Sequence, residues 1–345
     1  MAQRGLGLDR LGSPFPTYFA FVMATGIISI AARGLGYHRL GWALFGIDLF
    51  AYGIVWACGV IRLVHAPGSV WRELRHHETG PIFLTIVAGT GVLGSDAAAH
   101  LFPADFILAL FSVAVLAWIF LIYCFLVVVI EGREKPPLET GLSGSWLLVV
   151  VSTTSLAILG SDVLDSIGQP PTLIFLCYFW LSLGWFYYVV LASVIFYRFV
   201  FVPMTPGEVA GPWWINAGAA AITVLAGSKL MELSGLALGS FQLRDLLSPV
   251  VTVFWADATF WIPLLTMLFA WKHLVRARPF RYSAELWSVA FPLGMYAAAT
   301  EHFVVAFGLP FLVPVARVVF WVGLIVWLLS SLGMVRRIIP GLKEA

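Results

Sequence analysis

Charged residues are scarce in this sequence. Asp, Glu, Lys and Arg make up 11% of its 345 residues, while hydrophobic residues make up 61%, and an ordinary soluble domain has roughly a quarter of its residues charged. The net charge of +2 is spread between apolar runs, which leaves no basic tract for nucleic acid. The composition predicts a protein of the lipid bilayer with no nucleic-acid partner.

Cysteine and histidine are also few. The three cysteines, Cys58, Cys124 and Cys177, fall singly inside apolar runs, so neither a disulfide framework nor a metal site is indicated. All seven histidines lie in loops or at the ends of apolar runs, whereas a haem between membrane helices needs histidines inside those helices. A membrane haem or redox protein is therefore disfavoured, and we predict no catalytic residue, metal or cofactor.

Ten long apolar runs fill most of the chain. A helix of about 20 residues crosses a bilayer core about 30 Å thick, and breaks rich in proline, glycine and charge separate the runs. The predicted transmembrane helices lie at about 14–34, 40–64, 79–98, 105–130, 144–163, 172–202, 213–234, 248–273, 284–303 and 312–335. Short loops predict one all-α membrane domain over 1–345, made of five hairpins, with no soluble segment sizeable enough for a sensor or scaffold.

The basic residues predict the orientation of these helices. Five of the 20 Lys and Arg residues lie on one side, and the other fifteen lie on the side of the N-terminus. The five are Arg33, Arg39, Lys229, Arg244 and Arg317. Because basic residues are retained in the cytoplasm, both termini are predicted to be cytoplasmic, in a plasma or inner membrane.

Similar segments recur on the odd-numbered helices, one hairpin apart. Thr25-Gly26 matches Thr90-Gly91, and Leu93-Gly94-Ser95-Asp96 matches Leu159-Gly160-Ser161-Asp162 and, more loosely, Ala226-Gly227-Ser228-Lys229. Gly, Ala, Ser and Thr are about twice as frequent in the odd helices as in the even ones. We therefore predict an inner ring of odd helices around a pore, with the even helices outside; close packing without a pore is the alternative.

Small residues of the odd helices are the predicted pore lining. They are Thr25, Gly26, Thr90, Gly91, Gly94, Ser155, Gly160, Gly227 and Gly294.

Two segments resemble a known family. They are Pro14-Phe15-Pro16-Thr17-Tyr18-Phe19-Ala20-Phe21-Val22-Met23-Ala24-Thr25-Gly26-Ile27 and Trp287-Ser288-Val289-Ala290-Phe291-Pro292-Leu293-Gly294-Met295-Tyr296. They are similar to the tellurite-resistance and dicarboxylate-transporter family, which includes bacterial tellurite-resistance proteins, fungal malate and sulfite transporters, and the slow anion channels of plant guard cells.

The resemblance implies a homotrimer in which each protomer has its own pore, lined by the odd helices. It also implies that a phenylalanine of the ninth helix, here Phe291, occludes that pore. The chain departs from the family in one respect, because its fifth and seventh helices carry Gly160 and Gly227 and no mid-helix proline.

Phe291 also has an interpretation independent of the family. It precedes Pro292, which bends a helix and redirects neighbouring side chains. An aromatic ring on an inner helix would form an apolar constriction that gates by excluding water. The alternative is an ordinary core phenylalanine.

Charges near the helix ends are the remaining candidates. Lys229 takes the repeat position of Asp96 and Asp162, so it either attracts anions at the outer mouth or pairs with Glu232. Arg278 and Arg281 precede the ninth helix and would concentrate anions at the cytoplasmic mouth, although the positive-inside rule already explains them.

The function predicted from these features is passive or weakly coupled movement of small anions: chloride, nitrate, sulfite or a four-carbon dicarboxylate such as malate. Hydroxyls of Thr25, Thr90 and Ser155 would bind the anion weakly. A proton-coupled dicarboxylate symporter is the alternative. It needs a titrating carboxylate, and the two acids inside spans, Asp48 and Asp257, lie on even helices, where a structural role is the competing interpretation.

Overall fold

The computed structural model describes residues 15–164, 166–204, 211–233, 237–238, 241–275, 283 and 286–338. Its long helices are α1 (Phe19–Gly34), α2 (His38–His65), α4 (Thr85–Ala99), α5 (Ala104–Glu131), α7 (Leu148–Leu164), α8 (Pro171–Phe201), α9 (Ile215–Glu232), α10 (Leu243–Ala270), α11 (Trp287–Phe307) and α12 (Val313–Ile338). The connections include the short helices α3 (Pro67–Leu74) and α6 (Leu138–Gly141) and an antiparallel pair of strands, β1 (Ala237–Leu238) and β2 (Phe241–Gln242). The predicted all-α class is confirmed.

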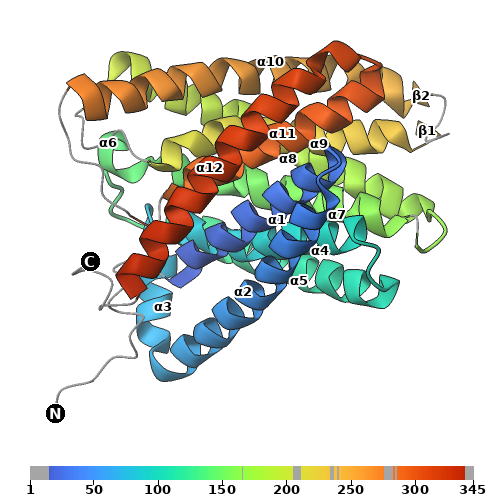
Figure 1. The fold of residues 1–345 in the computed structure, drawn as a ribbon. Helices are drawn as coiled ribbons and strands as arrows, with labels where there is room; N and C mark the ends of the chain where they lie inside the picture. Colours follow the sequence, from blue (N-terminus) through green and yellow to red (C-terminus); the bar gives the residue numbers. More distant parts are fainter. Residues whose placement is uncertain are drawn as a thin grey trace.

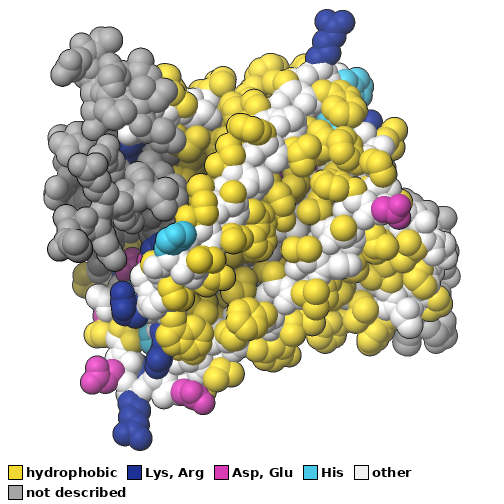
Figure 2. Space-filling model, turned by 90° about the horizontal axis from the view of Figure 1, so that it is seen from below, with side chains coloured by type: hydrophobic (Ala, Val, Ile, Leu, Met, Phe, Trp, Pro, Cys, Tyr) yellow, Lys and Arg dark blue, Asp and Glu magenta, His cyan; other side chains and the backbone are white. Residues whose placement is uncertain are grey.

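Nine of the described helical segments are long and apolar enough to cross a membrane. The helix α9 is not among them, because its 18 residues include the polar side chains of Asn216, Lys229 and Glu232. Apolar side chains cover the middle of the face in Figure 2, and charged side chains lie toward its margins. The chain is thus an integral membrane protein, and the tenth span, α9, stays a prediction.

Several helices have ends that differ from the predicted boundaries, and α10 and α11 are two examples. The helix α10 begins at Leu243, before the predicted start at 248, because Pro249 lies inside its early turns instead of marking its start. The helix α11 runs from Trp287 to Phe307, whereas 284–303 was predicted. Gly308 ends it with a left-handed backbone, φ 68°.

Five helices form a closed inner ring. In order around the ring, α1 packs against α4, α4 against α7, α7 against α9, α9 against α11, and α11 against α1. Each ring helix also packs against the helix that follows it, so α2, α5, α8, α10 and α12 lie outside (Figure 1). In the apolar stretch of α7, 94% of the residues are buried, against 22% in that of α2.

The ring helices begin side by side at one end of the bundle. Four of them are preceded by 3-10 turns: η2 (Phe15–Tyr18), η3 (Gly80–Leu84), η4 (Gly144–Leu147) and η5 (Gly211–Trp214). These turns pack in series, and α11 packs against η5. The packing is tight, since a Cβ atom on Gly144 would overlap the carbonyl oxygen of Pro212. We call this end of the ring the N-terminal mouth and the opposite end the C-terminal mouth.

Candidate functional site: the axis of the inner ring

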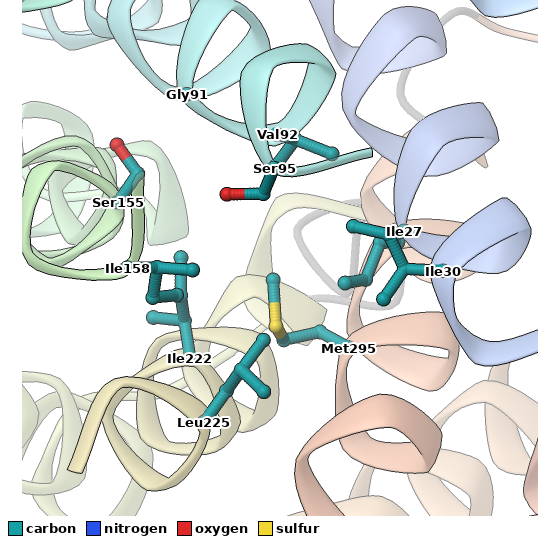
Figure 3. A pocket seen from close by; sticks show the side chains of 10 residues that line it. All are labelled: Ile27, Ile30, Gly91, Val92, Ser95, Ser155, Ile158, Ile222, Leu225 and Met295. Atoms are coloured by element: carbon teal, nitrogen blue, oxygen red, sulfur yellow. The ribbon is translucent and has the colours of Figure 1, made fainter. Parts of the chain in front are cut away.

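A small cavity lies on the axis of the inner ring. Its volume is about 10 Å³, which is roughly the space of one water. All five ring helices line it: Ile27 and Ile30 from α1, Gly91, Val92 and Ser95 from α4, Ser155 and Ile158 from α7, Ile222 and Leu225 from α9, and Met295 from α11. In Figure 3 the side chains of Ser95, Leu225 and Met295 point into this common space.

A layer of apolar residues lies one turn from the cavity lining toward the N-terminal mouth. Residues four positions apart share a helix face, so this layer is found four residues before the cavity lining. It consists of Met23, Ala88, Val151, Gly218 and Phe291, and we call it the gate layer. Met23 and Phe291 are each 2% exposed, and Ala88 and Val151 are fully buried. Phe291 is the sole aromatic residue of this layer.

Gly218 makes room for the ring of Phe291. A Cβ atom on Gly218 would lie 3.0 Å from Cγ of Pro292 and 3.2 Å from Cε1 of Phe291. Pro292 lies inside α11, where it interrupts the backbone hydrogen bonds. The phenyl ring of Phe291 therefore lies beside Pro292 of its own helix and against the backbone of Gly218 on α9, which has no side chain.

Charged side chains surround the C-terminal mouth. Four residues beyond the cavity lining, Asp162 of α7 and Lys229 of α9 form an ion pair. Farther out, Nδ1 of His302 on α11 lies 2.9 Å from Oε1 of Glu232. Lys229 therefore pairs with Asp162 on the neighbouring ring helix α7 and not with Glu232 on its own helix. Its side chain is 19% exposed and that of Asp162 is 11% exposed.

Of the predicted pore-lining residues, Gly91 and Ser155 line the cavity. The other glycines lie where neighbouring helices approach closely. Gly26 faces Asp48 and Val92, Gly94 faces Leu159, Gly160 faces Cys177 and Phe111, Gly227 faces Val251, and Gly294 faces Ile27 and Ile28. Arg278 and Arg281 lie outside the described residues.

Hydroxyl groups of the ring helices are bonded to aromatic side chains of the outer helices. Trp327 Nε1 on α12 donates to Thr25 Oγ1 over 2.9 Å, and Tyr52 OH on α2 lies 3.0 Å from Thr90 Oγ1. Two further tryptophans repeat the pattern, with Trp118 donating to Thr153 and Trp255 donating to Thr300. Thr25 and Thr90 therefore face the outer helices.

The aliphatic side chains of the cavity lining were not predicted from the sequence; they include Ile27, Ile158, Ile222 and Met295. Three residues of the cavity lining recur in the sequence at the spacing of the repeat: Ile27, Val92 and Ile158. This recurrence could have identified them. Isoleucine and valine are common in every membrane helix, so composition alone did not separate them from lipid-facing residues.

The two acids predicted inside even helices have different surroundings. Asp257 of α10 accepts a hydrogen bond from Tyr188 of α8. Asp48 of α2 is fully buried, and neither of its carboxylate oxygens has a hydrogen-bond partner in the part of the chain that the structure describes. Among those described residues no group of three His, Cys, Asp or Glu side chains is placed to hold a metal ion.

A closed ring of helices with a small cavity on its axis, in a membrane protein, is the arrangement expected of a channel or transporter. The chain matches the voltage-dependent anion channel family (SLAC1) over residues 15–335. It therefore belongs to this family, which confirms the resemblance seen in the sequence. Members of the family are channels or transporters and not enzymes, so the chain is a membrane anion channel or transporter.

Proteins of two organisms are similar to this chain in sequence. An uncharacterized transporter of Methanocaldococcus jannaschii is 20% identical over 340 residues, which cover 94% of this chain and 95% of that protein. A second one from the same organism is 21% identical, with 97% and 96% covered. An uncharacterized membrane protein of Mycobacterium tuberculosis is 35% identical over 153 residues, or 44% of this chain and 77% of the relative.

Proposed function

We propose that this protein moves small anions, such as chloride, nitrate, sulfite or malate, along the axis of the inner ring, and that Phe291 gates the path. The observation that carries the proposal is the cavity lined by all five ring helices directly beyond the gate layer. An apolar layer of this kind blocks ions by excluding water. Movement of the Phe291 ring would join the N-terminal mouth to the cavity.

The direction of the ring helices favours anions. Their first turns pack side by side at the N-terminal mouth, and each helix start carries roughly half a positive charge. The cavity offers only hydroxyls such as Ser95 and Ser155 and no described basic residue. Such a wall binds an anion weakly, which suits passage more than retention.

The test is anion current across a planar bilayer that contains the purified protein, with chloride and then malate as the permeant anion. We compare the wild type with Phe291→Ala and with Phe260→Ala, which removes a phenyl ring that is 55% exposed on the outer helix α10. Loss of the Phe291 ring frees on the order of 100 Å³, enough for a few waters at about 30 Å³ each. We expect a large anion-selective current from Phe291→Ala and none from the control variant beyond the wild-type level.

Replacing a buried phenylalanine by alanine costs about 3–5 kcal/mol of stability, so Phe291→Leu serves as a milder variant. It should give a current between those of the wild type and Phe291→Ala. An unchanged current in both folded variants would refute the gate. Silence of all variants would indicate a slow coupled carrier and would lead to flux assays under a pH gradient.

The proposal also covers the oligomeric state of the protein and its orientation in the membrane. We infer a homotrimer with one pore in each protomer, in a plasma or inner membrane, with both termini in the cytoplasm. Exposed apolar side chains on the outer helices, such as Phe50 at 72% and Ile130 at 73%, supply surface for lipid and for neighbouring protomers. The mass of the complex in detergent tests the trimer, and labelling of single cysteines at the two ends of the chain in intact cells tests the orientation.

A further inference from the structure

Asp48 lies behind the wall of the central cavity. Its Oδ2 atom would be 2.6 Å from a Cβ atom on Gly26, and Cγ1 of Val92, which lines the cavity, would be 2.8 Å from that same point. Both carboxylate oxygens are buried without a hydrogen-bond partner among the described residues. An ionised carboxylate in such a place costs a great deal of free energy, so a structural role as an ion pair does not account for Asp48.

A second buried acid, Asp96 of α4, lies near enough to interact electrostatically with Asp48. Its Oδ1 atom is 2.9 Å from Oγ of Ser29 and 3.2 Å from Nδ1 of His100, while Oδ2 has no described partner. Ser95, the residue before Asp96, lines the cavity, and its buried Oγ atom also lacks a described partner. We call Asp48 and Asp96 the acid pair.

The groups around the acid pair come from each helix that packs against it. From α1, Arg33 acts on Asp96 by its charge. On α2 itself, the hydroxyl of Tyr52 is bonded to Thr90 of α4, and Arg62 pairs with Glu73 of α3 at the far end. The charged group that acts on Asp48 is another acid, Asp96. No positive group acts on Asp48 among the described residues.

His100 connects the acid pair to the C-terminal mouth. It directly follows the last residue of α4 and is 3% exposed. The rings of Trp42 and Phe45 lie 4.6 Å and 4.8 Å from its own ring. Its Nδ1 atom lies 2.9 Å from the backbone carbonyl oxygen of Asp96, and its Nε2 atom is buried without a described hydrogen-bond partner.

We propose that the acid pair binds a proton together with an anion in the cavity, so that one proton accompanies each anion. A negative charge on Asp48 behind the cavity wall repels an anion inside it, and protonation removes this repulsion. Each ligand therefore raises the affinity of the other by the same factor. The proton is taken up on one side of the membrane and released on the other together with the anion, so no oxidation or reduction is involved. This inference rests on the proposed function.

The test uses proteoliposomes with a trapped pH dye and an inward chloride gradient. In the wild type, chloride entry acidifies the lumen and proceeds without valinomycin, because the proton carries the compensating charge. In Asp48→Asn and Asp96→Asn, acidification falls by about tenfold, a typical size for coupling between sites, while chloride entry continues when valinomycin and potassium compensate its charge. Asp257→Asn is the matched control, since it removes a buried acid that already has a partner, and it behaves like the wild type.

The outcomes separate the two hypotheses. The inference would be overturned if chloride entered the wild type without acidifying the lumen and entered the acid-pair variants at the same rate. The proposed function would still stand. Loss of acidification in Asp257→Asn alone would also overturn it and would place the coupling on α10. Absence of chloride entry both in the wild type and in Phe291→Ala, with or without valinomycin, would refute the proposed function and the inference with it.

Discussion

Neutralising Asp162 should raise the anion current that enters from the C-terminal mouth. Asp162 and Lys229 cancel each other's charge in the wild type, and Asp162→Asn leaves Lys229 unopposed. Lys229 is one turn beyond Leu225 of the cavity lining, which is about 6 Å at 1.5 Å per residue. A unit charge at about 6 Å changes the energy of an anion by about 0.7 kcal/mol under the screening of bulk water, or roughly threefold in occupancy.

The assay is current at low chloride in the open Phe291→Ala background. Asp162→Asn should increase the current from the C-terminal side about threefold, and Lys229→Gln should reduce it by a similar factor. The double variant should return to the starting value. The effect should persist at 0.1 M salt, where the screening length is about 10 Å, and vanish at 1 M, where it is about 3 Å. Glu73→Gln is the control, because it breaks the Arg62–Glu73 pair away from the ring. Equal currents in all variants, or effects that do not depend on salt, would refute this reasoning.

Three further predictions concern packing. Gly144→Ala should lower the unfolding temperature in detergent, because the added methyl group would overlap Pro212. The expected loss of stability is about 1–3 kcal/mol. Gly46 has open space around it, so the control variant Gly46→Ala should be neutral or slightly stabilising. Gly218→Ala should reduce opening of the wild-type pore by crowding the Phe291 ring, and current should return when Phe291→Ala is added. Trp327→Phe should cost about 1 kcal/mol by removing the bond to Thr25, and a thermal shift of zero would contradict that assignment.

The architecture was readable from the sequence because it depends on patterns that every hairpin repeats. Small residues on the odd helices predicted the inner ring, and the structure closes that ring through α1, α4, α7, α9 and α11. Helix ends were less predictable, because a proline such as Pro249 can lie inside a helix, here in the second turn of α10, instead of marking its start.

The side chains on the axis were harder to predict. Thr25 was expected in the pore because a hydroxyl suits an anion, but its partner, Trp327, is far away in the sequence and on the last helix. Likewise, the choice of Asp162 over Glu232 as the partner of Lys229 depends on how α7 and α9 are rotated against each other. Such rotations follow from packing among several helices and leave no local pattern.

The hydrogen bonds between outer aromatic side chains and ring threonines also have a mechanical consequence. Tyr52, Trp118, Trp255 and Trp327 each anchor a ring helix to a helix that lies against lipid. A ring helix fastened in this way does not slide alone, so a tilt of its outer partner is transmitted to the axis. Outer helices tilt when the thickness of the bilayer changes. We therefore expect anion movement to depend on the chain length of the surrounding lipids.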